Sequence, residues 1–160
     1  MPSTDKKILI VGPERVDEMV TARALLVALK QQHPHCQIDL LASADVTAVA
    51  ETMAEVDRVI VSPLEHDEFD LGRRHSLGLG LKEECYDQAV VLPGSFKSAL
   101  IPFFAEIPLR TGWRGQMRFF LLNDIRLFSK RRYPLREQRY LALGYEPGAV
   151  LPEVILPDRG

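Results

Sequence analysis

Apolar and polar residues follow two alternating patterns along the chain. Five short runs rich in apolar residues recur, and four of them are followed by Gly, Pro or Ser. Such runs are typical of strands that are buried on both faces of a parallel sheet. We expect the five strands at residues 7–11, 37–42, 58–61, 88–92 and 109–113.

Between these runs, apolar residues recur at the three- and four-residue spacing of amphipathic helices. Ser43 or Asp45 is expected to cap the second of these helices and Ser95 the fourth, while Pro102 should kink or shorten the helix that contains it. The pattern predicts helices at residues 17–32, 45–53, 96–105 and 133–143, and a further helix of uncertain start that reaches residue 84.

Strands that alternate with helices indicate the α/β class, here a Rossmann-like parallel sheet with helices on both faces. The chain has 160 residues, of which 46% are hydrophobic, enough for one domain with a real core. We expect this domain at residues 1–145. Prolines 147, 152 and 157 predict an extended linker at residues 146–160. In such sheets, ligands bind beyond the carboxyl ends of the strands.

Composition excludes several function classes. Twenty basic and 22 acidic side chains leave a net charge of −2, so no overall field recruits nucleic acid or an anionic membrane, and any anion binding must be local. The start has no apolar signal region and no apolar run is long enough to span a bilayer. Cys36 and Cys85 lack metal-type spacing, as does the HPHC run at residues 33–36, so we expect a cytoplasmic protein with reduced thiols and neither metal nor cofactor.

The turn GPERVDE, residues 12–18, is a first candidate site. It lacks the glycines of a nucleotide-binding fingerprint, and its carboxylates would repel phosphate. Asp17 and Glu18 can complement the positive end of the following helix. One of them can instead serve as a general base, and the residues alone leave both interpretations open.

The stretch LPGSFKSALIPFF, residues 92–104, is a second candidate. Gly94 permits close backbone approach, Ser95 offers a hydroxyl and Lys97 supplies a cation at a helix N-terminus, a combination suited to phosphate or carboxylate. The alternative is a capped helix with an exposed lysine.

Two basic segments complete the candidates. RTGWRGQMR, residues 110–118, gathers three arginines around Trp113 and can hold an anionic sugar, unless Trp113 is a core anchor and the arginines are solvated. The run at residues 130–132, followed by Arg136 and Arg139, can contact anionic lipid or phosphate, or form a solvated face.

One long segment resembles a known family. The run YDQAVVLPGSFKSALIPFFAEIPLRTGWRGQMRFFLLNDIRL, residues 86–127, looks like the N-terminal half of the lipopolysaccharide heptosyltransferase II family. The opening KILIVGPERVDEM and the stretch LREQRYLALGY fit the same register, so the resemblance covers nearly the whole chain.

The resemblance implies one half of a GT-B glycosyltransferase, a bacterial cytoplasmic enzyme that acts peripherally at the inner membrane. Such enzymes transfer heptose from ADP-heptose to a lipid A–core acceptor, with inversion at the sugar. The N-terminal domain holds the acceptor, and the C-terminal domain holds the donor. On this basis we expect that the chain lacks the donor site, has no nucleic-acid partner and is inactive alone.

The chain departs from the family at its first turn. The family pattern there is Gly-Pro-Ser-Trp-Val-Gly-Asp-Met, whose Asp is the general base for the acceptor hydroxyl. Here Asp17 replaces Gly, and Glu18 replaces the catalytic Asp with a side chain one methylene longer. Glu18 is therefore the candidate catalytic residue. The candidate acceptor-binding residues are Asp17, Ser95, Lys97, Arg110 and Arg114.

These replacements also support a different hypothesis. Glu14, Arg15 and Asp45 add charge at positions that would face the acceptor or a second domain, and Glu106 stands where the family has Gly. Charging an exposed interdomain surface counters aggregation. The alternative to a transferase half is thus a non-catalytic, redesigned single-domain scaffold. A small-molecule binding module around Lys97 ranks last.

Overall fold

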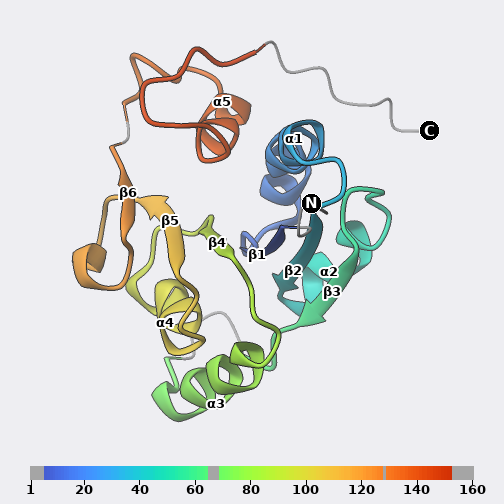
Figure 1. The fold of residues 1–160 in the computed structure, drawn as a ribbon, viewed down its shortest axis with the longest axis vertical. Helices are drawn as coiled ribbons and strands as arrows, with labels where there is room; N and C mark the ends of the chain where they lie inside the picture. Colours follow the sequence, from blue (N-terminus) through green and yellow to red (C-terminus); the bar gives the residue numbers. More distant parts are fainter. Residues whose placement is uncertain (1–5, 65–68, 128, 153–160) are drawn as a thin grey trace, which may run out of the picture.

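The computed structural model describes residues 6–64, 69–127 and 129–152, and contains a six-stranded sheet in which all strands run parallel (Figure 1). The strand order is β3-β2-β1-β4-β5-β6, the order of a Rossmann fold. The strands are β1 (Lys7–Val11), β2 (Gln37–Ala42), β3 (Arg58–Val61), β4 (Gln88–Val91), β5 (Leu109–Trp113) and β6 (Asp124–Arg126).

Helices cover both faces of the sheet, as predicted (Figure 1). One face packs against α1, α2 and α5, and the other against α3, α4 and the short 3-10 helix η1. The helices are α1 (Val16–Gln32), α2 (Ala44–Ala50), α3 (Leu71–Lys82), α4 (Phe96–Phe104), η1 (Arg118–Phe120) and α5 (Arg136–Ala142).

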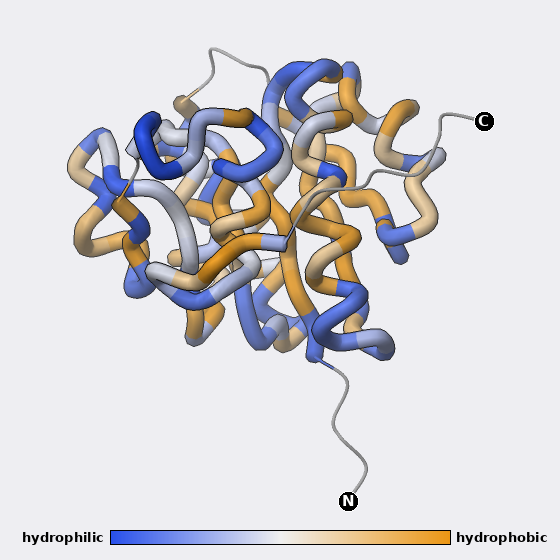
Figure 2. The backbone as a smooth tube through the Cα atoms, turned by 90° about the horizontal axis from the view of Figure 1, so that it is seen from above, coloured by the Kyte–Doolittle hydropathy of each residue, from blue (hydrophilic) through white to orange (hydrophobic). Residues whose placement is uncertain are grey.

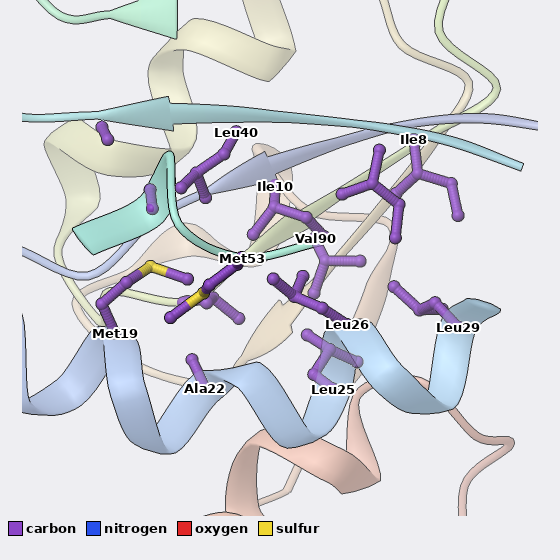
Figure 3. Packing of buried hydrophobic residues seen from close by; sticks show 14 of the residues in the cluster. Ile8, Ile10, Met19, Ala22, Leu25, Leu26, Leu29, Leu40, Met53 and Val90 are labelled. Atoms are coloured by element: carbon purple, nitrogen blue, oxygen red, sulfur yellow. The ribbon is translucent and has the colours of Figure 1, made fainter. Parts of the chain in front are cut away.

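The largest core cluster lies between α1 and the central strands (Figure 3). Strand residues such as Ile8, Ile10 and Leu40 meet Leu25 and Leu26 of α1, and all five are fully buried. Burying one such side chain contributes about 1.5–3 kcal/mol. This packing fixes the start of α1 relative to the carboxyl end of β1, where the candidate site lies.

Most predicted elements are confirmed within one residue, but three helices differ. The helix of uncertain start runs over Leu71–Lys82 and ends two residues before residue 84. The second helix ends at Ala50 rather than residue 53, because the following amides close turns onto Val49 and Ala50. The last helix begins at Arg136 rather than residue 133. Tyr133 instead closes a turn by donating its amide proton to the carbonyl of Ser129.

The predicted caps have different outcomes. Ser95 caps α4, since its side chain accepts a hydrogen bond from the amide of Ser98 at 3.3 Å. Ser43 stands at the N-cap position of α2, but its side chain makes no capping hydrogen bond. The helix containing Pro102 ends at Phe104, one residue earlier than expected.

The sixth strand, β6, was not predicted. It has three residues, two of them charged, and long-range contacts stabilise it. The hydroxyl of Thr111 in β5 donates to Asp124 at 2.8 Å, and the Arg126 guanidinium donates to both oxygens of Asp124 at 2.8 and 2.9 Å. Arg126 also reaches the carbonyls of Ala142 and Tyr145, so β6 anchors the end of α5.

The chain after α5 is described as far as residue 152. The amide of Ala149 donates to the carbonyl of Glu146, which closes a turn within the predicted linker. The rest of that linker lies outside the described residues, and the domain boundary at residue 145 stays a prediction. Within the described part of the chain, every helix is too short or too polar to cross a bilayer.

Candidate functional site

The candidate site lies on the rim, which we define as the loops that follow the carboxyl ends of β1, β2, β3 and β4. Gly12 brings the first of these loops against β2, with its amide 2.9 Å from the carbonyl oxygen of Leu41. A Cβ at Gly12 would lie 3.1 Å from that same oxygen and from a methyl of Leu40. These contacts are tight for any side chain, so glycine lets the loop pack closely against β2 just before α1 begins.

A cavity of about 280 Å³ opens at this rim between the start of α1, the loop after β4 and α5. We call it the Glu18 pocket. It brings together Glu18 and Ser95, two of the six predicted site residues. Its lining consists of Pro13, Glu14, Arg15, Glu18, Leu92, Pro93, Gly94, Ser95 and Tyr140.

Glu18 is half-buried in the first turn of α1. Within the described residues its carboxylate accepts no hydrogen bond and joins no ion pair, although it faces the positive end of the helix dipole. A carboxylate in this state is an acceptor for a proton from a ligand hydroxyl. The geometry thus permits general-base chemistry alongside the helix-dipole interaction.

Tyr140 is a member of this pocket that sequence reasoning missed. Burial first, and then the negative charge of Glu18, raise the pKa of Tyr140 to about 12. The phenol therefore stays protonated at neutral pH and can donate a hydrogen bond into the pocket. Only its position in the predicted last helix was visible in the sequence, because the contact depends on α5 packing against α1.

Asp17 differs from its neighbour Glu18. Its two carboxylate oxygens each lie 3.1 Å from a guanidinium nitrogen of Arg15, and both side chains are exposed. Asp17 is not among the residues that line the Glu18 pocket. An exposed pair of this kind contributes about 0.2–1 kcal/mol. The structure therefore presents Glu18, rather than Asp17, to a ligand in the pocket.

The N-terminus of α4 is already capped from two sides. The Ser95 hydroxyl accepts from the Ser98 amide, and the Gln116 side-chain oxygen accepts from the Phe96 amide at 2.8 Å. Lys97 is half-buried, and it does not line the Glu18 pocket. This arrangement favours the capped-helix interpretation of the segment over the anion site.

The three arginines around Trp113 do not form one cluster. Arg110 lies near the amino end of β5, away from the rim, and its guanidinium donates to the carbonyls of Leu121 at 2.6 Å and Ile107 at 2.7 Å. Burial lowers the pKa of Arg110. The structure thus gives Arg110 a role in holding the chain after β5 and does not bring it to the pocket.

Arg118 is buried and joins two loops, whereas Arg114 is exposed. The Arg118 guanidinium donates to the carbonyl of Pro93 at 2.8 Å and to that of Trp113, and burial lowers its pKa. Arg114 lines a separate cavity of about 320 Å³ together with residues 115–119. Arg114 is therefore available to a ligand on this side of the molecule, whereas Arg118 is not, and Arg110 lines a different cavity of about 460 Å³ with Phe103 and Glu106.

A smaller cavity of about 80 Å³ lies beside the Glu18 pocket, at the ends of β1, β2 and β3. Two of its polar lining groups were not predicted as site residues. Arg74 is buried and donates to the carbonyls of Phe69 at 2.6 Å and Lys97 at 3.1 Å. The Ser43 hydroxyl is buried without a hydrogen bond in the described structure.

The sheet order defines a Rossmann-like domain, and comparison with solved structures gives the class of protein, one half of a GT-B glycosyltransferase. A solved structure of E. coli ADP-heptose lipopolysaccharide heptosyltransferase II superposes with a TM-score of 0.82 and 39% identity, over 95% of this chain and 47% of that one. An E. coli heptosyltransferase solved with ADP gives a TM-score of 0.73 at 18% identity, over 92% of this chain and 49% of that one, which supports the fold alone.

Sequence comparison then gives the family. The model of glycosyltransferase family 9 (heptosyltransferase) matches residues 74–153, half of the chain, and the chain belongs to this family. It is 46% identical to lipopolysaccharide heptosyltransferase 2 of Escherichia coli, over 95% of this chain and 44% of that protein. It is 46% identical to lipooligosaccharide heptosyltransferase 2 of Haemophilus influenzae, over 89% of this chain and 41% of that protein. The chain thus spans less than half the length of these relatives.

Proposed function

We propose that this chain is the acceptor-binding half of an inverting heptosyltransferase, which transfers heptose from ADP-heptose to the inner core of lipopolysaccharide in the bacterial cytoplasm. Identity to heptosyltransferases 2 over nearly the whole chain supports this function. The observation that carries it is the half-buried carboxylate of Glu18, which lines the rim pocket together with Ser95 and Tyr140.

In this proposal Glu18 is the general base. It takes the proton of the acceptor hydroxyl while that oxygen forms its bond to the anomeric carbon of heptose, and the bond from that carbon to ADP breaks. The Tyr140 phenol and the Ser95 hydroxyl orient the acceptor sugar in the pocket. Arg114, and Asp17 with its ion-pair partner Arg15, contact the acceptor outside the pocket.

We further propose that the 160-residue polypeptide does not transfer heptose by itself. An inverting transfer needs ADP-heptose held against the rim, and the proposed base lies on an open surface here. The alternative is a folded scaffold without catalytic function. The exposed ion pair of Arg15 and Asp17 supports this alternative, because it places charge where a ligand would enter.

The test reconstitutes transfer from two halves. This chain is mixed with a separately produced ADP-heptose-binding half of the E. coli relative, and heptose transfer to a lipid A–core acceptor is measured. We expect transfer by the mixture and none by the chain alone. Glu18→Gln should lower the rate ~10²- to 10⁴-fold. The control Glu83→Gln removes an exposed carboxylate that follows α3, away from the rim, and should leave the rate nearly unchanged.

Three outcomes would contradict parts of this proposal. Transfer by the chain alone would refute its inactivity. Equal rates for the native chain and Glu18→Gln would refute the base assignment. A mixture that neither transfers heptose nor binds the acceptor, although the chain is folded, would favour the scaffold.

A further inference from the structure

The cavity that Arg110 lines lies between α3 and α4, and we call it the α3–α4 cavity. Its volume is about 460 Å³, larger than that of the Glu18 pocket and within the range of small-molecule sites. The two helices lie side by side on the face of the sheet opposite α1 (Figure 1). They end at Lys82 and Phe104, just before β4 and β5, so the cavity lies toward the amino end of the sheet and away from the rim.

A close approach of the two helices shapes this cavity. A Cβ at Gly78 would lie 2.5 Å from the Cβ of Phe104, so the helices touch at this point. One face of α3 lines the cavity through His75, Leu79 and Lys82, which follow helical spacing. Phe104 lines it from α4. The cavity is therefore a groove whose two walls are held together by the contact at Gly78.

Aromatic and apolar side chains form part of these walls. The rings of His75 and Phe104 lie edge to face at 4.9 Å, and those of Phe103 and Phe104 at 5.8 Å. Hydrophobic segments run mainly through the middle of the molecule (Figure 2), but Leu79 is 47% exposed and Phe103 37%. A ligand with an aromatic ring would cover these exposed side chains and extend the edge-to-face packing.

Arg110 brings a half-buried cation to the cavity. Its Nε and Nη1 atoms donate to the carbonyls of Leu121 and Ile107, which fix the guanidinium, and its Cζ lies 5.6 Å from the centre of the Phe103 ring. The third nitrogen, Nη2, makes no hydrogen bond to any described residue, and the guanidinium joins no ion pair with them. Cations in such places are stabilised by a paired anion, so an anionic group in the cavity would complete the contacts of Arg110.

The other two charges at the cavity are already paired with each other. The Lys82 Nζ lies 2.5 Å from a carboxylate oxygen of Glu106, and both side chains are at least half exposed. Both residues line the cavity, and together they carry no net charge. Arg110 therefore leaves the cavity with a net positive charge.

We infer that the α3–α4 cavity binds a small aromatic carboxylate. The ring packs against Phe103 and Leu79, while the carboxylate accepts a hydrogen bond from the Nη2 of Arg110. A cation would be repelled by Arg110, and inorganic phosphate would leave the exposed rings uncovered. This cavity and the rim lie at opposite ends of the sheet, so the inference does not rest on the proposed transferase function.

The test is a titration of the isotope-labelled chain with three probes, followed by NMR of the backbone amides. We expect naphthoate to bind with a Kd on the order of 0.1–1 mM and to shift the amides of α3 and α4. Naphthamide has the same shape without the charge and should bind roughly 10-fold more weakly. Decalin carboxylate keeps the charge but has no aromatic ring, and should bind about 3-fold more weakly.

Charge variants locate the anion. Arg110→Gln should weaken naphthoate binding roughly 10-fold, because it removes the cation that the carboxylate contacts. Glu106→Gln should strengthen binding roughly 2- to 5-fold, since it removes a repelling carboxylate and releases Lys82. An unfolded variant cannot mimic this gain. The control Glu83→Gln removes the same charge from an exposed position outside the cavity, and should leave the Kd nearly unchanged.

A second pair of variants locates the ring without disturbing the hydrogen bonds of Arg110. Leu79→Ser removes an apolar side chain from the cavity wall and should weaken naphthoate binding about 3- to 5-fold. Its control is Leu71→Ser at the start of the same helix. Leu71 is 50% exposed, as Leu79 nearly is, but it does not line the cavity. This control should bind as the native chain does.

Several results would overturn the inference. Equal binding of naphthoate and naphthamide would show that the cavity does not select an anion. Binding by Glu106→Gln that is no tighter than by Glu83→Gln would place the carboxylate elsewhere. Amide shifts confined to the rim, with equal Kd values for the two leucine variants, would assign the probe to the Glu18 pocket. Heptose transfer plays no part in these readouts, so their failure leaves the proposed function separately testable.

Discussion

The two ends of the sheet use their carboxylates differently. At the amino end, Asp39 is fully buried and accepts hydrogen bonds from Tyr86 at 2.7 Å and from Arg58 at 2.9 Å. Arg58 also lies 3.3 Å from Glu84, whose other contact is Lys7 at 2.7 Å. At the carboxyl end, Glu18 lines an open pocket with no such partners in the described residues. Carboxylates with hydrogen-bond and ion-pair partners stabilise the fold. Glu18, which has no such partners in the described residues, is available to react with a ligand.

The largest expected effect comes from removing the buried carboxylate at the amino end. Asp39→Ala leaves the Tyr86 hydroxyl and part of Arg58 without their acceptor, and should lower the free energy of unfolding by about 3 kcal/mol. Denaturation in urea measures the change. Glu18→Ala should change the same free energy by less than about 0.5 kcal/mol. Similar losses in both variants would contradict the division between the two ends.

A smaller loss of stability is expected from removing an arginine that stabilises the fold near the carboxyl end of the sheet. Arg118→Met removes donors to the carbonyls of Pro93 and Trp113 and should lower the free energy of unfolding by about 2 kcal/mol. Arg114→Met, at the exposed neighbour, should leave stability within about 0.5 kcal/mol. The two urea midpoints are compared directly. Coinciding midpoints would mean that Arg118 does not hold the two loops together.

The smallest expected effect is a change in the pKa of one of two tyrosines, which lie at opposite ends of the sheet. Burial raises the pKa of both, but Glu18 adds to the shift of Tyr140, whereas Asp39 adds to that of Tyr86. Glu18→Gln should therefore lower the pKa of Tyr140 from about 12 and leave Tyr86 unchanged. Ultraviolet absorbance of the phenolates follows both titrations. An unshifted Tyr140 would show that its ring does not sense Glu18.

The raised pKa of Tyr140 also predicts how the free energy of unfolding changes with pH. Because the folded pKa of Tyr140 is raised above the unfolded value of about 10, its contribution is complete below pH ~10 and is lost as the pH rises through about 12. Urea denaturation across this range should show a decline that is smaller for Tyr140→Phe than for the native chain. A decline of the same size in both would assign the loss to other groups.

Local patterns in the sequence predicted the parts of the fold that local physics determines. The apolar run at residues 7–11 and the capped start of α4 at Ser95 needed only burial and hydrogen-bonding rules. Strand β6 did not follow from such rules, because three residues with two charges have no strand signal until Thr111 pairs with Asp124.

The candidate site was predictable only in part, for a similar reason. The position of Glu18 after the first strand was visible in the sequence. The place of Tyr140 in the same pocket was not visible, because it arises from packing between helices far apart in the chain. Sequence spacing also did not predict the positions of the arginines. Arg110, Arg114 and Arg118 lie close in sequence but have different environments in the fold.

The ends of the strand order have a consequence for how the molecule behaves in a crowded solution. The two outermost strands, β3 and β6, are four and three residues long, and each carries arginine. Short edges with charged side chains are poor templates for adding a strand from another molecule. The sheet therefore resists growing into a fibril from either side, and this resistance does not depend on what the rim binds.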